Sequence, residues 1–158
     1  MNKRVKFICH AALIAAIYVL LTYLAAAMGL SSGVIQVRFS EALCILPYFT
    51  AAAIPGVTLG CLLANILTGC AFWDIVFGTL ATLIGVVCAY YLRKHKWLVP
   101  LPSVLSNTVI IPFVLKSVYG VPDAHWFLIL TVGIGEIISI YGLGMLLLFA
   151  LEKRNVFR

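Results

Sequence analysis

Long apolar runs follow one another along this chain, and short clusters of basic residues lie between some of them. Hydrophobic residues occupy 64% of the 158 positions and charged residues only 10%, whereas a soluble domain carries about 25% charged residues. A helix needs about 20 apolar residues to cross a bilayer, and shorter ones occur where the bilayer is thin. The runs therefore predict an all-α membrane protein.

Six membrane-spanning helices are expected from the lengths of the runs. Their predicted ranges are 8–28, 38–53, 55–70, 73–92, 99–118 and 125–151. Pro55 divides the second from the third, because proline suits the first turn of a helix and breaks its interior. A single helix kinked at Pro55 is the alternative. The first run is longer than the core of a signal peptide, about 7–15 residues, so we expect a retained helix there.

The distribution of positive charge distinguishes the two topologies, because basic residues gather on the cytoplasmic side of short loops. Six crossings place three basic clusters on one side and leave only Arg38 and Lys116 on the other. Merging the second and third helices would place the middle cluster outside. The clusters are Lys3, Arg4 and Lys6; Arg93, Lys94 and Lys96; and Lys153, Arg154 and Arg158. We therefore predict one integral-membrane domain over residues 1–158, a six-helix bundle with both termini cytoplasmic. The net charge of +6 then reflects topology and not binding to nucleic acid.

Polar side chains are informative in such a chain, because a central charge costs about 2.5–3.5 kcal/mol on insertion scales. In the six-helix arrangement the ionisable residues outside the basic clusters and the cytoplasmic tail fall in the middle or outer half of the membrane. This convergence predicts a polar pocket that opens to the outside. The candidate substrate-binding residues are Gln36, Arg38, Glu41, Asn65, Trp73, Asp74, Asn107, Lys116 and Glu136.

Four of the charged candidates also have a structural interpretation. Asp74 would cap the fourth helix and complement its dipole. Arg38 and Glu41 are three residues apart and would pair on one helix face. Lys116 would extend to the outer headgroups.

The deep polar residues are harder to assign to packing alone. Asn65 and Asn107 suit interhelical hydrogen bonds as well as ligand contacts. Glu136 follows two glycines in an apolar helix and has no partner nearby in sequence, which favours a functional role.

Motifs for catalysis and for ATP binding are absent from the sequence. There is no GxxxxGK[ST] phosphate loop, and no GxSxG or HExxH signature. The five cysteines show no metal-ligand spacing and are expected to be packing residues. We therefore expect neither an enzyme nor a protein with a bound metal or cofactor.

Small residues recur every four positions in the first helix, as Ala11 with Ala15 and Ala12 with Ala16. Such spacing allows helices to approach closely in lipid. Packing within the bundle and docking to another membrane subunit are both consistent with it.

Four stretches, in order along nearly the whole chain, resemble the QueT family of queuosine-precursor transporters. They are 36–43 (QVRFSEAL), 49–56 (FTAAAIPG), 74–83 (DIVFGTLATL) and 133–136 (GIGE). The family is grouped with the substrate-binding S components of energy-coupling-factor (ECF) importers. The resemblance implies a multi-pass protein of the prokaryotic cell membrane, assembled with a coupling transmembrane subunit and two ATP-binding subunits. It also implies that the alanine pairs of the first helix dock to the coupling subunit.

A 7-deazaguanine base, such as queuine or the aminomethyl precursor preQ1, is the substrate that the resemblance implies. Its guanine-like edge presents adjacent N–H donors to a carboxylate and a carbonyl to a donor. Two alternatives stay open. One is an S component for another vitamin-like heterocycle, and the other is a membrane interaction protein or small channel without a transport substrate.

Overall fold

Every regular element that the computed structural model describes, over residues 2–30 and 35–154, is helical. Arg158 of the third basic cluster lies outside these ranges. In chain order the elements are α1 (Lys3–Ala27), η1 (Phe39–Tyr48), α2 (Ala53–Leu67), α3 (Phe72–Tyr91), η2 (Lys96–Leu98), α4 (Leu101–Ser117), α5 (His125–Glu136), η3 (Ile137–Gly144) and α6 (Met145–Arg154). The prediction of an all-α protein is confirmed.

Four helical segments are long and apolar enough to cross a membrane. They are Lys3–Ala27, Phe72–Tyr91, Lys96–Ser117 and His125–Arg154. Two shorter apolar helices, Phe39–Tyr48 and Ala53–Leu67, lie between the first and second of these. A turn separates the two short helices, and Pro55 lies in the first turn of α2, where its missing N–H costs no helical hydrogen bond.

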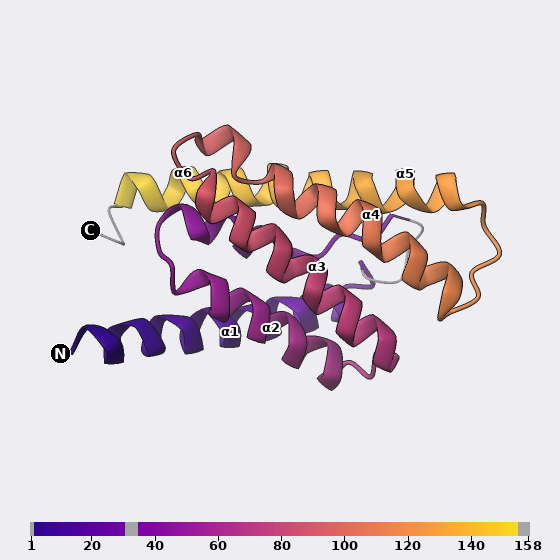
Figure 1. Ribbon diagram of the computed structural model, residues 1–158, viewed down its shortest axis with the longest axis horizontal. Helices are drawn as coiled ribbons and strands as arrows, with labels where there is room; N and C mark the ends of the chain where they lie inside the picture. Colours follow the sequence, from indigo (N-terminus) through magenta and orange to yellow (C-terminus); the bar gives the residue numbers. More distant parts are fainter. Residues whose placement is uncertain (1, 31–34, 155–158) are drawn as a thin grey trace.

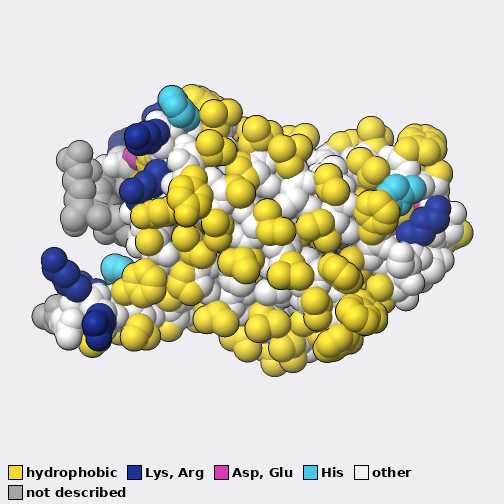
Figure 2. Space-filling model, viewed as in Figure 1, with side chains coloured by type: hydrophobic (Ala, Val, Ile, Leu, Met, Phe, Trp, Pro, Cys, Tyr) yellow, Lys and Arg dark blue, Asp and Glu magenta, His cyan; other side chains and the backbone are white. Residues whose placement is uncertain are grey.

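The helices place the basic residues together. The start of α1, the end of α6 and the connection between α3 and α4 lie at one end of the molecule (Figure 1). Most of the visible Lys and Arg side chains gather there, and a broad apolar surface extends away from them (Figure 2). We call this the basic end. The α2–α3 and α4–α5 connections lie at the opposite end.

Helix α2 packs closely on α1 through two glycines. A Cβ atom added at Gly60 would lie 2.6 Å from the Cβ of Tyr18, and one added at Gly56 would lie 2.9 Å from the carbonyl oxygen of Ala11. Small residues therefore allow these backbones to approach, as expected in lipid. Of the two alanine pairs, Ala11 and Ala15 are buried, whereas Ala12 and Ala16 are exposed.

Two irregular helices, η1 and η3, pack against each other, and η1 is buried whereas η3 is partly exposed. The sequence predicts one short membrane helix over 38–53, but the helix there covers only Phe39–Tyr48 and is a 3₁₀ helix, and Ala53 already begins α2. Pro47 lies within η1 and supplies no N–H donor. Its neighbour η3 is a π-helix inside the long segment from α5 to α6, a type of irregularity that is frequent at functional sites. Gly144 of η3 allows the close contact, since its Cβ would meet Ile45 at 3.0 Å.

A polar contact joins three segments at the basic end. The Glu152 carboxylate of α6 accepts hydrogen bonds from the Tyr48 hydroxyl (2.7 Å) and from the Lys96 ammonium (3.3 Å). The contact fixes the end of η1 to α6 and to the loop between α3 and α4. Because Lys96 and Glu152 are both about one-third exposed, their ion pair contributes about 0–1 kcal/mol.

Candidate ligand-binding site

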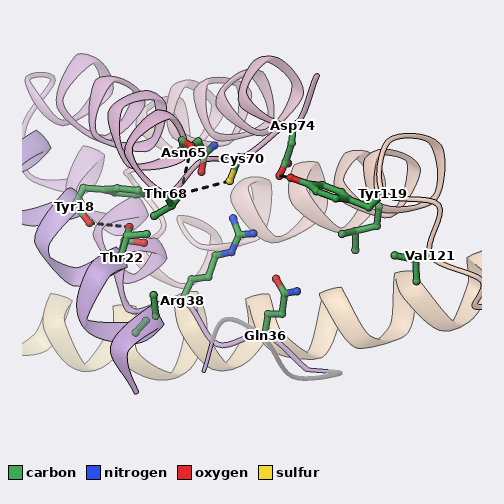
Figure 3. Close-up of a pocket in the computed structure, with 14 residues that line it drawn as sticks. Tyr18, Thr22, Gln36, Arg38, Asn65, Thr68, Cys70, Asp74, Tyr119 and Val121 are labelled. Carbon is green, nitrogen blue, oxygen red and sulfur yellow. Dashed lines mark hydrogen bonds between the residues drawn. The ribbon is translucent and has the colours of Figure 1, made fainter. Parts of the chain in front are cut away.

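A cavity of about 410 Å³ lies between α1, α2, the start of α3 and the residues just after α4, and several polar side chains project into its mainly apolar surface (Figure 3). We call it the ligand cavity, since its volume falls within the range of about 300–1,000 Å³ typical of small-molecule sites. Asp74 and Tyr119 place it towards the end opposite the basic end. Its lining residues are Tyr18, Thr22, Ala25, Ala26, Gln36, Arg38, Ser40, Asn65, Thr68, Cys70, Asp74, Leu115, Tyr119 and Val121.

An extended segment before η1 carries two of the predicted residues into this cavity. Arg38 has an extended backbone, with φ −110° and ψ 107°. Alternate side chains of an extended chain face the same side. Gln36 and Arg38 accordingly both point into the cavity, and the guanidinium reaches towards its middle (Figure 3). The extended form therefore aims two polar side chains at one ligand volume.

The long C-terminal helical segment holds this extended segment in place. The Arg38 backbone N–H donates to the Ser139 hydroxyl (3.0 Å), which donates in turn to the Gly135 carbonyl (2.8 Å). A Cβ atom added at Gly135 would lie only 2.2 Å from the Gln36 carbonyl oxygen. Glycine at 135 is therefore required for the backbones to approach this closely.

The Arg38 guanidinium has no carboxylate oxygen within 4.0 Å among the residues that the structure describes. The local Arg38–Glu41 ion pair considered from the sequence is therefore not formed. The buried Glu41 carboxylate instead accepts hydrogen bonds from the Tyr18 hydroxyl (2.5 Å) and the Cys44 thiol (3.2 Å). Within residues 2–30 and 35–154 the guanidinium also has no hydrogen-bond acceptor, so its N–H groups can donate to a ligand in the cavity.

Asp74 stands on the cavity wall beside a tyrosine from the α4–α5 connection. The Tyr119 hydroxyl donates to the Asp74 carboxylate (2.8 Å) and accepts from the Ala71 backbone N–H (3.1 Å). Burial raises the pKa of Tyr119 to about 12, so the hydroxyl keeps its proton at neutral pH. No side chain caps α3, although Asp74 lies in its first turn. The capping hydrogen bond suggested by the sequence is therefore absent, and Asp74 faces the ligand volume.

The remaining deep polar residues separate into two groups. Asn65 lines the cavity from α2, and its amide nitrogen lies 3.6 Å from the Cys61 sulfur. Asn107 and Glu136 lie apart from the cavity lining and bind each other, with the Asn107 amide donating to the Glu136 carboxylate (3.1 Å). This buried hydrogen bond joins α4 to α5, and Glu136 as a ligand contact stays a prediction.

Two predicted residues lie on the outer surface of the bundle. Trp73 is 55% exposed and stacks on Phe77 at a centroid distance of 5.9 Å, in a groove between α3 and α4. Lys116 is exposed near the end of α4. Neither side chain lines the ligand cavity.

Several cavity residues were not among the predicted site residues. Ser40 is the most telling of them, because it is 1% exposed and its hydroxyl has no hydrogen-bond partner among the described residues. A buried polar group without a partner is uncommon and suits a ligand contact. The sequence signal for Ser40 was its position in the 36–43 stretch, between the predicted site residues Arg38 and Glu41. Among the described residues no group of three or more His, Cys, Asp or Glu side chains is placed to hold a metal ion.

The sequence was compared with protein families and with individual proteins. A family model described as QueT transporter matches residues 8–153. The chain belongs to the QueT transporter family. One curated relative, the Queuosine precursor transporter QueT of Lactococcus lactis subsp. cremoris (strain MG1363), is 38% identical over 73 residues.

The likeness to that relative covers part of each protein. The matched stretch is 46% of this chain and 43% of the relative. No solved structure matches the chain. The family match includes the extended segment, Asp74 and the Gly135–Ser139 region, so the ligand cavity lies within the part that the family shares.

Proposed function

We propose that this protein is the substrate-binding subunit of an energy-coupling-factor importer and that it takes a queuosine precursor, a 7-deazaguanine base, from outside the cell. The observation that carries the proposal is the ligand cavity with its polar side chains, in a family described as transporters and towards the end opposite the basic end. Basic clusters face the cytoplasm. The cavity therefore opens to the outer side.

The cavity offers the hydrogen-bonding groups that a guanine-like edge needs. Such an edge presents adjacent N–H donors, which suit the Asp74 carboxylate, and a carbonyl, which suits the Arg38 guanidinium. Asn65 and Ser40 add an amide and a buried hydroxyl. Tyr18 and Tyr119 supply aromatic surface, and stacking on a base contributes about 1–3 kcal/mol.

Coupling to ATP requires other proteins. The sequence has no GxxxxGK[ST] phosphate loop, so this chain does not itself supply the ATP hydrolysis that drives import. We propose a coupling transmembrane subunit and two ATP-binding subunits as its partners. Ala12 and Ala16 remain exposed on α1 and are the alanines available for docking, whereas Ala11 and Ala15 are covered by α2.

A binding experiment tests this function. The purified protein in nanodiscs is titrated by calorimetry with 7-aminomethyl-7-deazaguanine, with guanine and with riboflavin. We expect saturable binding of the deazaguanine and none of the flavin. Binding of riboflavin alone would point to an S component for another vitamin, and binding of none of the three would contradict the proposal.

In liposomes, accumulation by this chain without the ATP-binding subunits would contradict the proposed coupling.

The proposed topology makes a second prediction, in which both ends and the α3–α4 loop face the cytoplasm. In a variant without native cysteines, Asp123→Cys is expected to react with an impermeant maleimide added to whole cells. His95→Cys is expected to react only after the membrane is opened, because it lies in the basic loop before η2. Labelling of His95→Cys on intact cells would exclude six crossings with cytoplasmic ends.

A further inference from the structure

A second cavity of about 190 Å³ adjoins the ligand cavity, and we call it the side cavity. Gln36, Leu115 and Val121 line both cavities, so the two cavities are adjacent and meet at these three residues. The Val121 N–H donates to the Leu115 carbonyl (3.3 Å), which fixes the turn after α4 that forms this wall. The other residues of the side cavity are Asp123, Phe127, Leu128, Thr131 and Val132.

The polar groups of the side cavity mostly accept hydrogen bonds. An ionised Asp123 only accepts. The Thr131 hydroxyl donates its proton to the Leu128 carbonyl (3.2 Å), which leaves its lone pairs for another donor. The Gln36 amide both donates and accepts, and no Lys, Arg or His lines this cavity. An arm with an apolar stem and an end that donates hydrogen bonds and carries positive charge complements these polar groups and the apolar side chains that form the rest of the lining.

We propose that the side cavity is a subsite that selects a ligand arm ending in a primary ammonium group. The heterocycle that carries this arm occupies the ligand cavity, so the inference rests on the proposed function. Gln36 lies in both walls and contacts both parts of the ligand. Asp123 is the residue that determines the preference for charge, and the buried Thr131 supplies a second acceptor.

Two ligands with the same ring but different arms distinguish binding in the side cavity from binding in the ligand cavity. One is 7-aminomethyl-7-deazaguanine, which carries the ammonium arm, and the other is 7-cyano-7-deazaguanine, which is neutral. Because Asp123 is exposed, its attraction is partly screened, and Asp123→Asn is expected to weaken binding of the aminomethyl ligand by about two- to fivefold. The cyano ligand should bind with unchanged affinity. Calorimetry at low ionic strength, where surface charge is screened least, measures both.

The conservative variant Asp123→Glu is the matched control, and it is expected to keep the preference for the aminomethyl ligand. An equal loss for both ligands in Asp123→Asn would show a structural effect and overturn the subsite. Unchanged binding of the aminomethyl ligand would overturn it as well. If the unaltered protein binds neither ligand, the proposed function itself fails, and the variant is not needed to show it.

Discussion

Gly135→Ala is expected to destabilise the protein strongly and to weaken ligand binding. The added methyl group would lie 2.2 Å from the Gln36 carbonyl oxygen, which is a backbone atom, so one of the two segments must move. Overpacking of a packed interior costs about 1–3 kcal/mol and occasionally more. This movement would displace the extended segment, and with it the Gln36 and Arg38 side chains that line the ligand cavity. Thermal unfolding in detergent and calorimetric titration measure the two effects.

The same helical segment provides a matched control. Gly142 lies in η3, and a Cβ atom added there would meet no heavy atom within 4 Å. Gly142→Ala is therefore expected to leave both the unfolding temperature and the ligand affinity near those of the unaltered protein. Equal behaviour of Gly135→Ala and Gly142→Ala would show that the close approach to Gln36 is not required.

Arg38→Gln is expected to reduce affinity for the deazaguanine ligand by about tenfold to a hundredfold, since hydrogen bonds to charged groups contribute about 1.5–3 kcal/mol. The guanidinium points into the cavity and has no carboxylate within 4.0 Å among the described residues, and we propose a ligand as its hydrogen-bond partner. Arg38→Lys keeps the charge but loses the planar fork, and it should restore affinity only in part. Calorimetric titration of both variants gives the comparison.

A control for total charge is the exposed Lys94 at the basic end. Lys94→Gln removes one positive charge outside the ligand cavity and should leave affinity unchanged. Wild-type affinity in Arg38→Gln would remove Arg38 from the proposed ligand contacts. A lowered unfolding temperature with unchanged affinity would assign it to the stability of the bundle.

The helical segments were predictable because each depends mainly on its own composition. The range 73–92 was expected and α3 runs from Phe72 to Tyr91, and the range 55–70 became α2 at Ala53–Leu67. The forms of η1 and η3 were not predictable in the same way. The 3₁₀ helix η1 and the π-helix η3 pack against each other although they are about a hundred positions apart in the chain. Local sequence patterns do not report such contacts, so they did not predict these two helix types.

The candidate site shows the same division. Because polar side chains cost free energy in a bilayer, the sequence predicted four site residues that the structure brings into one cavity. They are Gln36, Arg38, Asn65 and Asp74. The same argument named Lys116, and Trp73 was named as a ring that could stack on a base, but amphipathic side chains also suit a lipid-facing surface, where the structure places both. Tyr18 was missed, because a tyrosine in an apolar run looks like packing until its hydroxyl is seen to meet Glu41.

The burial of η1 has a consequence for how the protein responds to its bilayer. Residues 40–47 are all buried, so this short helix is shielded by its neighbours and meets little lipid. Hydrophobic mismatch acts on segments whose sides face the acyl chains, and those are the four long apolar segments. A thinner or thicker membrane therefore tilts or strains the outer helices first. The positions of Arg38 and Ser40 are therefore shielded from that strain, whereas Tyr18 and Asp74, which line the same cavity from α1 and α3, move with the outer helices.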